Sequence, residues 1–286
     1  MAEAAVIIPH YNDAMRLTRC LAALMPQIGP GIEVIVVDNG STESLAPLCA
    51  AWPGLRLVSE PAKGAAHARN RGVAETTAPL LFFLDCDCLP APDWLETARA
   101  VCGSADVTGG RIDVFDETPP PRSGAQAFEA VFAFDNRAYV ARQGFSVTAN
   151  LLTRRDVFVA TGPFRAGLSE DLDWCRRATA RGYRLAYEDG LRVGHPSRGD
   201  WPALCRKWRR LTEEGFGVNG ATPGRRLAWA GRALLMPVSI LAHLPRLLRH
   251  PALRDGGERR RGAATLARLR LVRMGWMLGQ ALRGRA

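Results

Sequence analysis

Short apolar strands alternate with helical segments along the first third of the chain, and this alternation constrains the fold more than any other feature. The predicted strands are Ala5–Ile8, stopped by Pro9, then Ile32–Val37, Leu55–Ser59 and Leu80–Leu84. The predicted helices between them are Leu17–Leu24, Ser44–Ala51 and Ala65–Glu75. Strand–helix–strand repeats of this length predict a parallel sheet with right-handed crossovers.

Polar residues follow the predicted strands, at the edge where parallel sheets bind ligands. The Leu80–Leu84 strand is apolar throughout, which predicts burial on both faces, and it leads into Asp85-Cys86-Asp87. Side chains at i and i+2 of an extended segment point the same way. Asp85 and Asp87 can therefore converge on one divalent cation, or on a cation and a ribose. Because Asp-x-Asp also occurs in ordinary turns, its context decides its meaning.

Three further segments carry charge at predicted strand or helix ends. Asp38 precedes the turn Asn39–Thr42, where its carboxylate can accept a hydrogen bond from a base or ribose, or only cap the turn. The segment Lys63–Gly72 places several cations beside a glycine, which suits a diphosphate, although a solvated helix face has the same composition. The acids of Glu170–Asp173 open a predicted helix, where the dipole favours them, but three acids exceed what a cap requires.

The rest of the chain is less regular and ends in a basic region. Its predicted elements are a strand over Asp106–Val114, a loop over Glu117–Gly124, a helix over Phe128–Tyr139, an extended segment over Ser146–Leu152 and a helix over Leu172–Arg181. Residues 1–200 carry 20 basic and 24 acidic side chains, whereas residues 201–286 carry 18 and 4. We therefore expect a main domain over 1–200 and a basic, amphipathic helical region over 201–286.

The cysteines and the N-terminus bear on compartment. The seven cysteines show no Cys-x-x-Cys pair, which predicts reduced thiols, and we interpret Cys86 and Cys88 as bystanders beside Asp87. The N-terminal residues contain no basic segment before the first strand, so we expect no signal peptide. These features predict a cytoplasmic protein.

Five segments, taken together, resemble glycosyltransferase family 2 in their order and separation. They are Val6–Asn12, Val36–Thr42, Gly64–Gly72, Asp85–Asp87 and Glu170–Asp173, within a resemblance that spans about residues 4–200. The resemblance implies a GT-A fold, which is a Rossmann-like, mostly parallel α/β sheet. It also implies a nucleotide-sugar donor, with UDP-sugars favoured, a divalent cation (Mn2+ or Mg2+) and transfer with inversion. Residues 1–104 would form the nucleotide-binding half and 105–200 the acceptor-binding half.

The resemblance assigns donor-binding roles to five positions. Pro9, Tyr11 and Asp38 would line the base and ribose pocket. Arg69 and Asn70 would approach the diphosphate or brace the Asp-x-Asp turn. These roles come from the family pattern and not from the spacing alone.

The resemblance also assigns the metal site and the catalytic base. Asp85 would face the ribose, while Asp87 would bind the cation and His195 would complete the metal site. Asp171 matches the catalytic base, which takes the proton from the acceptor hydroxyl. Two more residues, Asn150 and Glu170, would contact the donor or acceptor sugar.

The sequence departs from the processive members of this family. These enzymes carry Gln-x-x-Arg-Trp after the base, whereas here Leu204 replaces the glutamine and Lys207 precedes Trp208. Transfer of a single sugar is therefore favoured over polymerisation.

The C-terminal region combines apolar residues with arginines. The apolar run Ala233–Leu244 has only twelve residues, whereas a membrane-spanning helix needs about 20. From Ala264 onward, apolar residues recur at helical spacing between arginines, and Trp276 could sit at headgroup level. This pattern predicts peripheral attachment to the inner face of the cell membrane and an envelope or lipid-linked acceptor. An ordinary helical subdomain with a solvated arginine face is the alternative.

Two other function classes remain open at this point. A nucleotidyltransferase acting on a sugar phosphate would need a Gly-rich basic loop after the first strand, where the chain has Pro9–Asn12. A non-enzymatic nucleic-acid or membrane binder would use the basic region, but it leaves the acids at Asp85–Asp87 and Glu170–Asp173 without a role. Negative charge at that edge would also repel a phosphate backbone, so we expect no nucleic-acid partner.

Overall fold

The computed structural model describes residues 2–219 and 222–284, which form two compact units. The first, called the sheet unit, comprises Met1–Asp113, Asp135–Ala166 and Glu170–His195. The second, called the helical unit, comprises Val114–Phe134, Gly167–Ser169 and Pro196–Ala286. Each unit is described by itself, and the domain boundaries expected at residues 104 and 200 stay predictions.

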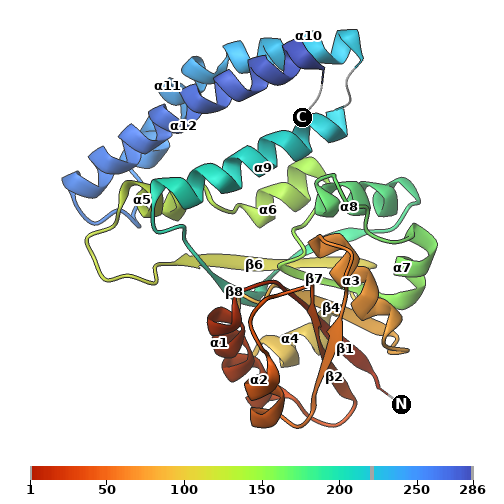
Figure 1. Ribbon diagram of the computed structural model, residues 1–286. Helices are drawn as coiled ribbons and strands as arrows, with labels where there is room; N and C mark the ends of the chain where they lie inside the picture. The colour runs from red at the N-terminus through yellow and green to blue at the C-terminus, as the bar shows by residue number, and fades with distance from the viewer. Residues whose placement is uncertain (1, 220–221, 285–286) are drawn as a thin grey trace. The chain divides into compact units, whose positions relative to one another are not determined.

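The sheet unit is built on a mixed sheet with the strand order β3-β2-β1-β4-β7-β6-β8-β5 (Figure 1). Its strands are β1 (Ala4–His10), β2 (Ile32–Asp38), β3 (Leu55–Ser59), β4 (Leu80–Leu84), β5 (Leu89–Pro90), β6 (Val107–Phe115), β7 (Asn150–Arg154) and β8 (Leu185–Pro196). Strands β1 to β4 pair in parallel, as the sequence predicts, while β7 pairs antiparallel with both β4 and β6. The carboxyl ends of β1, β2 and β4 therefore meet at one edge.

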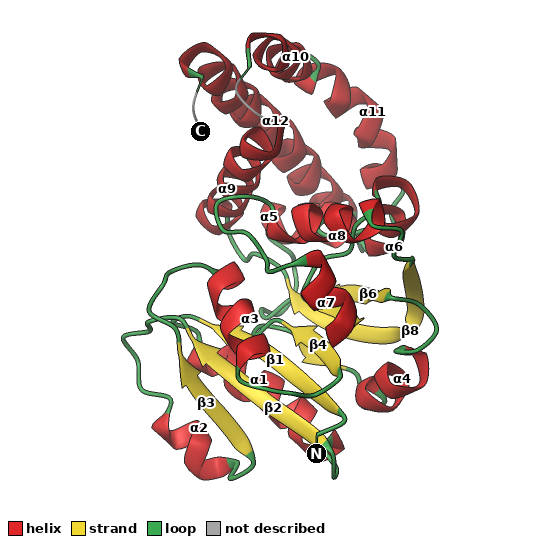
Figure 2. Ribbon diagram, turned by 90° about the vertical axis from the view of Figure 1, so that its right-hand side faces the viewer, coloured by secondary structure: helices red, strands yellow, loops and turns green. Residues whose placement is uncertain are grey.

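Helices cover both faces of this sheet (Figure 2). They are α1 (Ala14–Leu24), α2 (Ala46–Ala51), α3 (Ala65–Ala74), α4 (Trp94–Val101), α6 (Asn136–Ala138), α7 (Arg155–Thr161) and α8 (Glu170–Ala180), with a 3-10 turn η1 (Met25–Gln27) and a π-helical turn η2 (Tyr139–Gln143). Side chains of a strand alternate between faces. Val6 and Ile8 accordingly pack with α1 and α4, whereas Ile7 packs with α3, α7 and α8.

Strand β1 continues through Pro9 to His10, so the predicted stop at Pro9 is wrong. A proline lacks the N–H that a central strand normally donates. The pairing of β1 with β4 ends at Ile7, and the Asn39 N–H donates to the His10 carbonyl on the β2 side. The backbone nitrogen of Pro9 therefore faces β4, where the pairing of β1 with β4 has already ended. The missing N–H of Pro9 thus costs no hydrogen bond of the sheet.

The helix predicted over Phe128–Tyr139 is also wrong in its extent. Helix α5 spans Gly124–Phe132 and begins at a capping box, in which Ser123 and Gln126 satisfy each other's backbone N–H groups. Its start therefore precedes the predicted one. The Asp135 side chain accepts a hydrogen bond from the Ala138 N–H and so starts a separate helical turn, α6. The single helix that the sequence predicts is therefore divided into α5 and α6.

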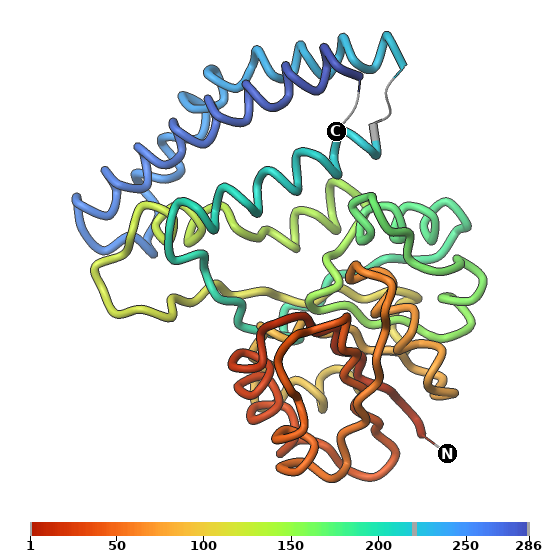
Figure 3. The backbone as a smooth tube through the Cα atoms, viewed as in Figure 1, coloured from red at the N-terminus to blue at the C-terminus, as the bar shows by residue number. Residues whose placement is uncertain are grey.

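The helical unit contains α5 and four further helices, α9 (Trp201–Asn219), α10 (Pro223–Leu234), α11 (Met236–Leu248) and α12 (Gly256–Arg283). Helices α10 and α11 both run alongside α12 (Figure 3). One apolar cluster joins α5, α9, α11 and α12 around Phe128, and a second joins α9, α10 and α12 around Trp229. The predicted C-terminal helix is therefore present and is packed against its neighbours.

The apolar run Ala233–Leu244 is divided between two helices. Helix α10 ends at Leu234, α11 begins at Met236, and their axes are bent by 49°. Within residues 2–219 and 222–284, no single helix is long and apolar enough to cross a membrane. Helices α10 and α11 would meet that test only as a bent pair, by length and composition.

Candidate active site

A buried histidine fixes the carboxylate at the end of β2. The His10 Nδ1 lies 3.2 Å from Asp38 Oδ1, and the His10 Nε2 accepts the Asp13 N–H at 3.1 Å. Since Nε2 is an acceptor, a neutral His10 carries its proton on Nδ1 and donates it to Asp38. The Ser41 N–H, at 3.3 Å, approaches the other oxygen of Asp38. The carboxylate is therefore oriented by the ends of β1 and β2 before any ligand arrives.

Asn39 holds the loop that enters α3. Its amide nitrogen donates to the carbonyls of Glu60 and Ala62, and its oxygen accepts the Gly64 N–H at 2.7 Å. Gly64 has a φ of +128°, which favours glycine at this bend. The loop presents Lys63, whose Nζ lies 5.2 Å from the centre of the Tyr11 ring. Tyr11 is exposed, while Pro9 is buried in β1.

Arg69 is the centre of the charged group. It lies on α3 with 3% of its surface exposed. Its Nη2 donates to Asp85 Oδ1 at 2.6 Å, and its Nη1 donates to a carboxylate oxygen of Glu170. Asp85 follows β4 and Glu170 begins α8, so one guanidinium joins three segments that are far apart in the sequence. Arg69 thus connects α3 to the Asp-x-Asp turn through Asp85, and its role stays a prediction.

Asp171 lies beside this ion-pair group at the start of α8. Its Oδ1 accepts from the Thr148 hydroxyl at 3.1 Å, and its Oδ2 from the Thr148 N–H at 3.3 Å. Burial raises the pKa of Asp171 to about 6; Arg69 opposes this shift, whereas Glu170 and Asp85 add to it. A carboxylate with a pKa near 6 is largely ionised at neutral pH and is also basic enough to take a proton.

The carboxylates around Arg69 also keep its guanidinium group protonated. Burial alone lowers the pKa of Arg69, but the carboxylates of Asp85, Glu170 and Asp171 raise it above its ordinary value. The guanidinium therefore stays charged although it is almost fully enclosed. An arginine between carboxylates in this way keeps three acids close together at one edge of the sheet.

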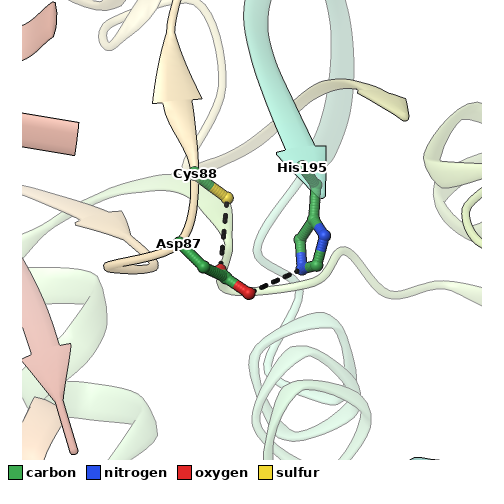
Figure 4. A group of neighbouring side chains, drawn as sticks. All are labelled: Asp87, Cys88 and His195. Carbon is green, nitrogen blue, oxygen red and sulfur yellow. Dashed lines mark hydrogen bonds and ion pairs between the residues drawn. The ribbon is translucent and has the colours of Figure 1, made fainter. Parts of the chain in front are cut away.

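The third group consists of Asp87, Cys88 and His195 (Figure 4). Each offers one possible ligand atom, and these atoms lie within 4.8 Å of one another. The Asp87 Oδ2 is 3.5 Å from His195 Nε2, and both side chains are largely buried. His195 comes from β8, whose pairing of Gly194 with Leu89 of β5 brings it beside the Asp-x-Asp turn.

The donor types of this group fit a divalent cation such as Mn2+. Mn2+ accepts carboxylate and imidazole ligands, and two such groups converge here, Asp87 from the turn after β4 and His195 from β8. The thiol of Cys88 is less suited, because burial, with added repulsion from Asp87 and Asp85, raises its pKa well above the ordinary value. Burial thus disfavours the thiolate form that Cys88 would need in order to bind a cation.

Two other predicted residues, Asn150 and Asn70, use their side-chain amides within the protein. Asn150 is fully buried; its oxygen accepts the Trp94 Nε1–H, and its nitrogen donates to the carbonyls of Arg111 and Leu191. Its amide is fully used inside the protein. Asn70 exchanges two hydrogen bonds of 2.9 Å with the backbone of Phe164 and so fixes that loop.

Three supporting residues, His10, Asn39 and Thr148, receive no role from the sequence alone. Cys88, which the sequence indicates is a bystander, has its sulfur next to Asp87 and His195. The only available signal was polarity in buried segments, since each of the three supports depends on a partner distant in sequence.

Comparisons with known proteins agree on one family. The family model described as Glycosyl transferase family 2 matches residues 5–173. The glycosyltransferase AglE of Haloferax volcanii is 31% identical over 215 residues, which cover 71% of this chain and 70% of that protein.

Solved structures agree on the fold. The mannosyltransferase PcManGT from Pyrobaculum calidifontis, in complex with GDP-Man and Mn2+, matches with a TM-score of 0.55 at 18% identity, over 99% of this chain and 73% of that one. Residues 1–349 of S. aureus TarS, in complex with UDP-GlcNAc, match with a TM-score of 0.57 at 17% identity, over 100% and 93%. These likenesses confirm the expected GT-A architecture, and together with the family match they show that this chain belongs to glycosyl transferase family 2 and is a glycosyltransferase.

Proposed function

We propose that this enzyme transfers one sugar from a nucleotide-diphosphate sugar to an acceptor hydroxyl, with inversion at the anomeric carbon. The observation that carries the proposal is the contact of Arg69 with Asp85 and Glu170, which places an acid of raised pKa, Asp171, next to the Asp-x-Asp turn. A donor-binding carboxylate and a proton acceptor thus share one edge of the sheet. This is the arrangement that direct displacement at a sugar carbon requires.

In the proposed reaction, Asp171 takes the proton of the acceptor hydroxyl. The acceptor oxygen forms a bond to the anomeric carbon while the bond from that carbon to the diphosphate oxygen breaks. The nucleotide diphosphate leaves with the bonding electron pair, on the face opposite the incoming oxygen. One displacement of this kind inverts the configuration. Thr148 keeps Asp171 in place through both carboxylate oxygens.

Asp87 and His195 would hold the divalent cation, Mn2+ or Mg2+. When bound, the cation would offset negative charge on the departing diphosphate. Asp85 is assigned to the ribose side of the donor, and Arg69 keeps its carboxylate in position. The roles of Asn150 and Asn70 are positional in this proposal, because their amides are used within the protein.

The donor base would lie between Tyr11, Pro9 and Asp38. Tyr11 offers an exposed ring on which a base can stack, and Asp38 offers an oriented acceptor for a base N–H or a ribose hydroxyl. Among the similar structures, one holds GDP-Man and another UDP-GlcNAc. A UDP-sugar is our first choice, and GDP-sugars are the principal competitors.

The test is a panel of UDP- and GDP-sugars with Mn2+, with Mg2+ and with EDTA, read by thermal shift and by release of nucleotide diphosphate. We expect a metal-dependent response to one donor, which is lost in Asp87→Ala. Cys86→Ser, next to Asp87 but outside the proposed metal group, serves as the matched control and should keep the response. No response to any donor under any condition would contradict the proposal.

Single-sugar transfer needs its own test once a donor and an acceptor are known. The mass of the product should increase by one sugar residue per acceptor, at low and high enzyme concentration alike. Products that carry many sugars after a single binding event would show a processive enzyme and overturn this part of the proposal.

We further propose that helices α10 and α11 attach the enzyme to the anionic, inner face of the cell membrane, which suits a lipid-linked or envelope acceptor. Half of the exposed large apolar side chains found in the described residues lie within this short segment; they are Leu227, Leu234, Leu235, Val238, Leu241 and Leu248. The segment Pro223–Leu248 contains four arginines and no acid. Exposed leucines and arginines together favour the interface of an anionic bilayer.

Vesicle flotation tests this attachment. The full chain should float with vesicles of phosphatidylcholine and phosphatidylglycerol, and Leu234→Ser with Leu241→Ser should reduce the bound fraction. Leu57→Ser is the matched control, because Leu57 is an exposed leucine on β3 and far from α10 in the sequence. Equal flotation of all three proteins would show that these leucines do not attach the enzyme.

A further inference from the structure

Two arginines of α12 lie one helical turn apart, next to α9 in the helical unit. The Arg273 guanidinium lies over the Trp208 ring, with its central carbon 4.5 Å from the ring centre. Its Nε donates to Thr212 Oγ1 at 3.2 Å, and that hydroxyl in turn donates to the Trp208 carbonyl at 2.7 Å. Arg273 is therefore held in one orientation, while Arg270 precedes it by three residues.

The group formed by Arg270, Arg273 and Trp208 is rich in donors that have no acceptor. The Arg270 Nε and the Trp208 Nε1 are both enclosed and have no hydrogen-bond partner among the described residues. The remaining nitrogens of Arg270 also form no hydrogen bond or ion pair with any part of the chain that the structure describes. Buried donors are normally satisfied, so these two enclosed N–H groups lack an expected acceptor, while the partly exposed guanidinium groups can receive one from outside the chain.

The acids of this region are used at other places. Glu213 pairs with Arg209, Glu214 with Arg210, and Asp255 caps α12. Glu258 accepts backbone N–H groups of Arg122 and Arg254, while Glu129 of α5 pairs with Lys207. None of these carboxylates serves Arg270 or Arg273. The positive charge of the two arginines is therefore not offset by the helical unit itself.

The effect of burial on these arginines agrees with this geometry. Burial lowers the pKa of Arg273 to about 10, with a further contribution from Arg270. Burial also lowers the pKa of Arg270, and no carboxylate opposes it. Enclosing charge without a partner destabilises a folded protein. Two such residues side by side are expected where a ligand supplies the missing charge.

We propose that Arg270, Arg273 and Trp208 form a binding site for a phosphate or diphosphate group, built from residues other than those assigned to the nucleotide sugar. Guanidinium groups match the oxygens of phosphate with several N–H donors each, and the indole N–H adds a neutral donor. The phosphate could belong to a membrane lipid or to a soluble molecule, and both sources share the same recognition chemistry. The site does not depend on the proposed transfer reaction, because it is tested by binding alone.

The first arm of the test uses inorganic pyrophosphate. The full chain is titrated in EDTA, which suppresses metal-dependent binding at the strand ends, and thermal shift and calorimetry report the affinity. Arg270→Met and Arg273→Met should each weaken binding by about tenfold or more, since a charged hydrogen bond is lost. Arg260→Met, which removes an exposed arginine of the same helix, should leave the affinity unchanged.

The second arm uses vesicles of phosphatidylcholine with phosphatidic acid, which display a phosphate monoester. Weaker binding of Arg270→Met and Arg273→Met, but not of Arg260→Met, supports the site with a lipid as its source. The same pattern with pyrophosphate alone supports a soluble source. If the three variants match the unmodified protein in both arms, the site does not exist.

Stability of the ligand-free protein provides an independent check. Removing an enclosed, unpaired charge should keep or raise the melting temperature of Arg270→Met relative to the unmodified chain. A melting temperature lower than that of Arg260→Met would assign Arg270 a structural role and overturn the proposal.

Discussion

The sheet unit and the helical unit both enclose arginines, but they treat the enclosed charge differently. In the sheet unit, Arg69 lies between the carboxylates of Asp85 and Glu170, which raise its pKa. In the helical unit, Arg270 and Arg273 face no carboxylate, and burial lowers the pKa of both. We interpret a buried arginine with carboxylate partners in the same chain as one that helps to position a site. We interpret a buried arginine without such partners as one whose charge is balanced by a bound ligand.

The helical unit also contains a counterexample within itself. The Lys207 Nζ lies 2.5 Å from Glu129 Oε1, and the other oxygen of Glu129 accepts the Arg198 N–H at 2.7 Å. Burial lowers the pKa of Lys207 to about 8, although Glu129 acts against this shift. The helical unit can therefore pair a buried cation with a carboxylate. Arg270 lacks such a partner because of where it lies in the unit, and not because the unit has no acids.

The largest expected effect is on catalysis at the sheet edge. Asp171→Asn removes the proposed proton acceptor while keeping the shape and the Thr148 contact of one oxygen. We expect the rate of nucleotide diphosphate release to fall by about 10²- to 10⁴-fold, which is the usual contribution of a general base. Steady-state assays with a saturating donor measure this rate.

Asp173→Asn is the matched control for that experiment. Asp173 lies on the same helix, but its oxygens pair with Arg177 and Arg165 instead of Thr148. Its replacement should change the rate far less. Full activity of Asp171→Asn would show that Asp171 is not the general base. The paired charges around Arg69 would then have no shown connection with catalysis.

The next effect is on stability in the helical unit. Lys207→Met leaves the carboxylate of Glu129 enclosed without its cation, which should cost about 3–5 kcal/mol in the free energy of unfolding. The double change Glu129→Met with Lys207→Met should recover most of this loss. Urea denaturation followed by circular dichroism measures both.

An exposed pair gives the scale for that result. Arg209 and Glu213 form a salt bridge on the surface of α9, and Arg209→Met should cost less than about 1 kcal/mol. If Lys207→Met lowers the free energy of unfolding no more than Arg209→Met does, the buried Lys207–Glu129 pair matters no more to stability than an exposed pair. The distinction drawn between paired and unpaired buried charges would then fail.

A smaller effect concerns the pH dependence of activity. The base acts when deprotonated, so the rate should fall as the pH drops through about 6, the pKa of Asp171. Arg69 lowers that pKa, so Arg69→Gln should raise it and move the acid limb of the rate profile to higher pH, by about one unit. Arg71→Gln, which removes an exposed partner of Glu75 on the same helix, should leave the limb in place.

The smallest effect is expected at Cys88. A protonated, buried thiol is a poor ligand for a hard cation, so Cys88→Ser should change the affinity for Mn2+ by less than about twofold, whereas Asp87→Asn should lower it by about tenfold or more. Titration with Mn2+ followed by electron paramagnetic resonance compares them. A large loss in Cys88→Ser would make the thiol a ligand.

The sequence predicts the buried part of the fold well, because continuous apolar runs such as Leu80–Leu84 have few alternatives to a buried strand. The prediction from sequence fails where the structure of a segment depends on how a neighbouring strand or helix pairs with it. Pro9 remains in a strand only because the pairing of β1 with β4 has ended, and no property of the residues near Pro9 shows this. The apolar pattern of Ala233–Leu244 continues through its break, but Pro237 in the first turn of α11 marks the start of a new helix.

For the candidate site, the sequence identifies charged residues but not their supports. Asp85, Glu170 and Asp171 stand out because their order and separation match a family pattern. His10 and Thr148 do not, since their partners Asp38 and Asp171 lie 28 and 23 residues away. The unpaired state of Arg270 is less accessible still, because it depends on nearby acids such as Glu213, Glu214 and Glu258 having other partners.

The two hydrogen bonds from Thr148 to Asp171 have a consequence for regiochemistry. A carboxylate clasped at both oxygens cannot rotate about its Cβ–Cγ bond without losing a partner. If Asp171 is the base, as proposed, the direction from which it accepts a proton is set by α8 and by the segment that leads into β7, before an acceptor is present. The hydroxyls of a sugar differ little in acidity, so a base held in one direction would distinguish them by position, and the linkage formed would depend on the backbone that holds Thr148.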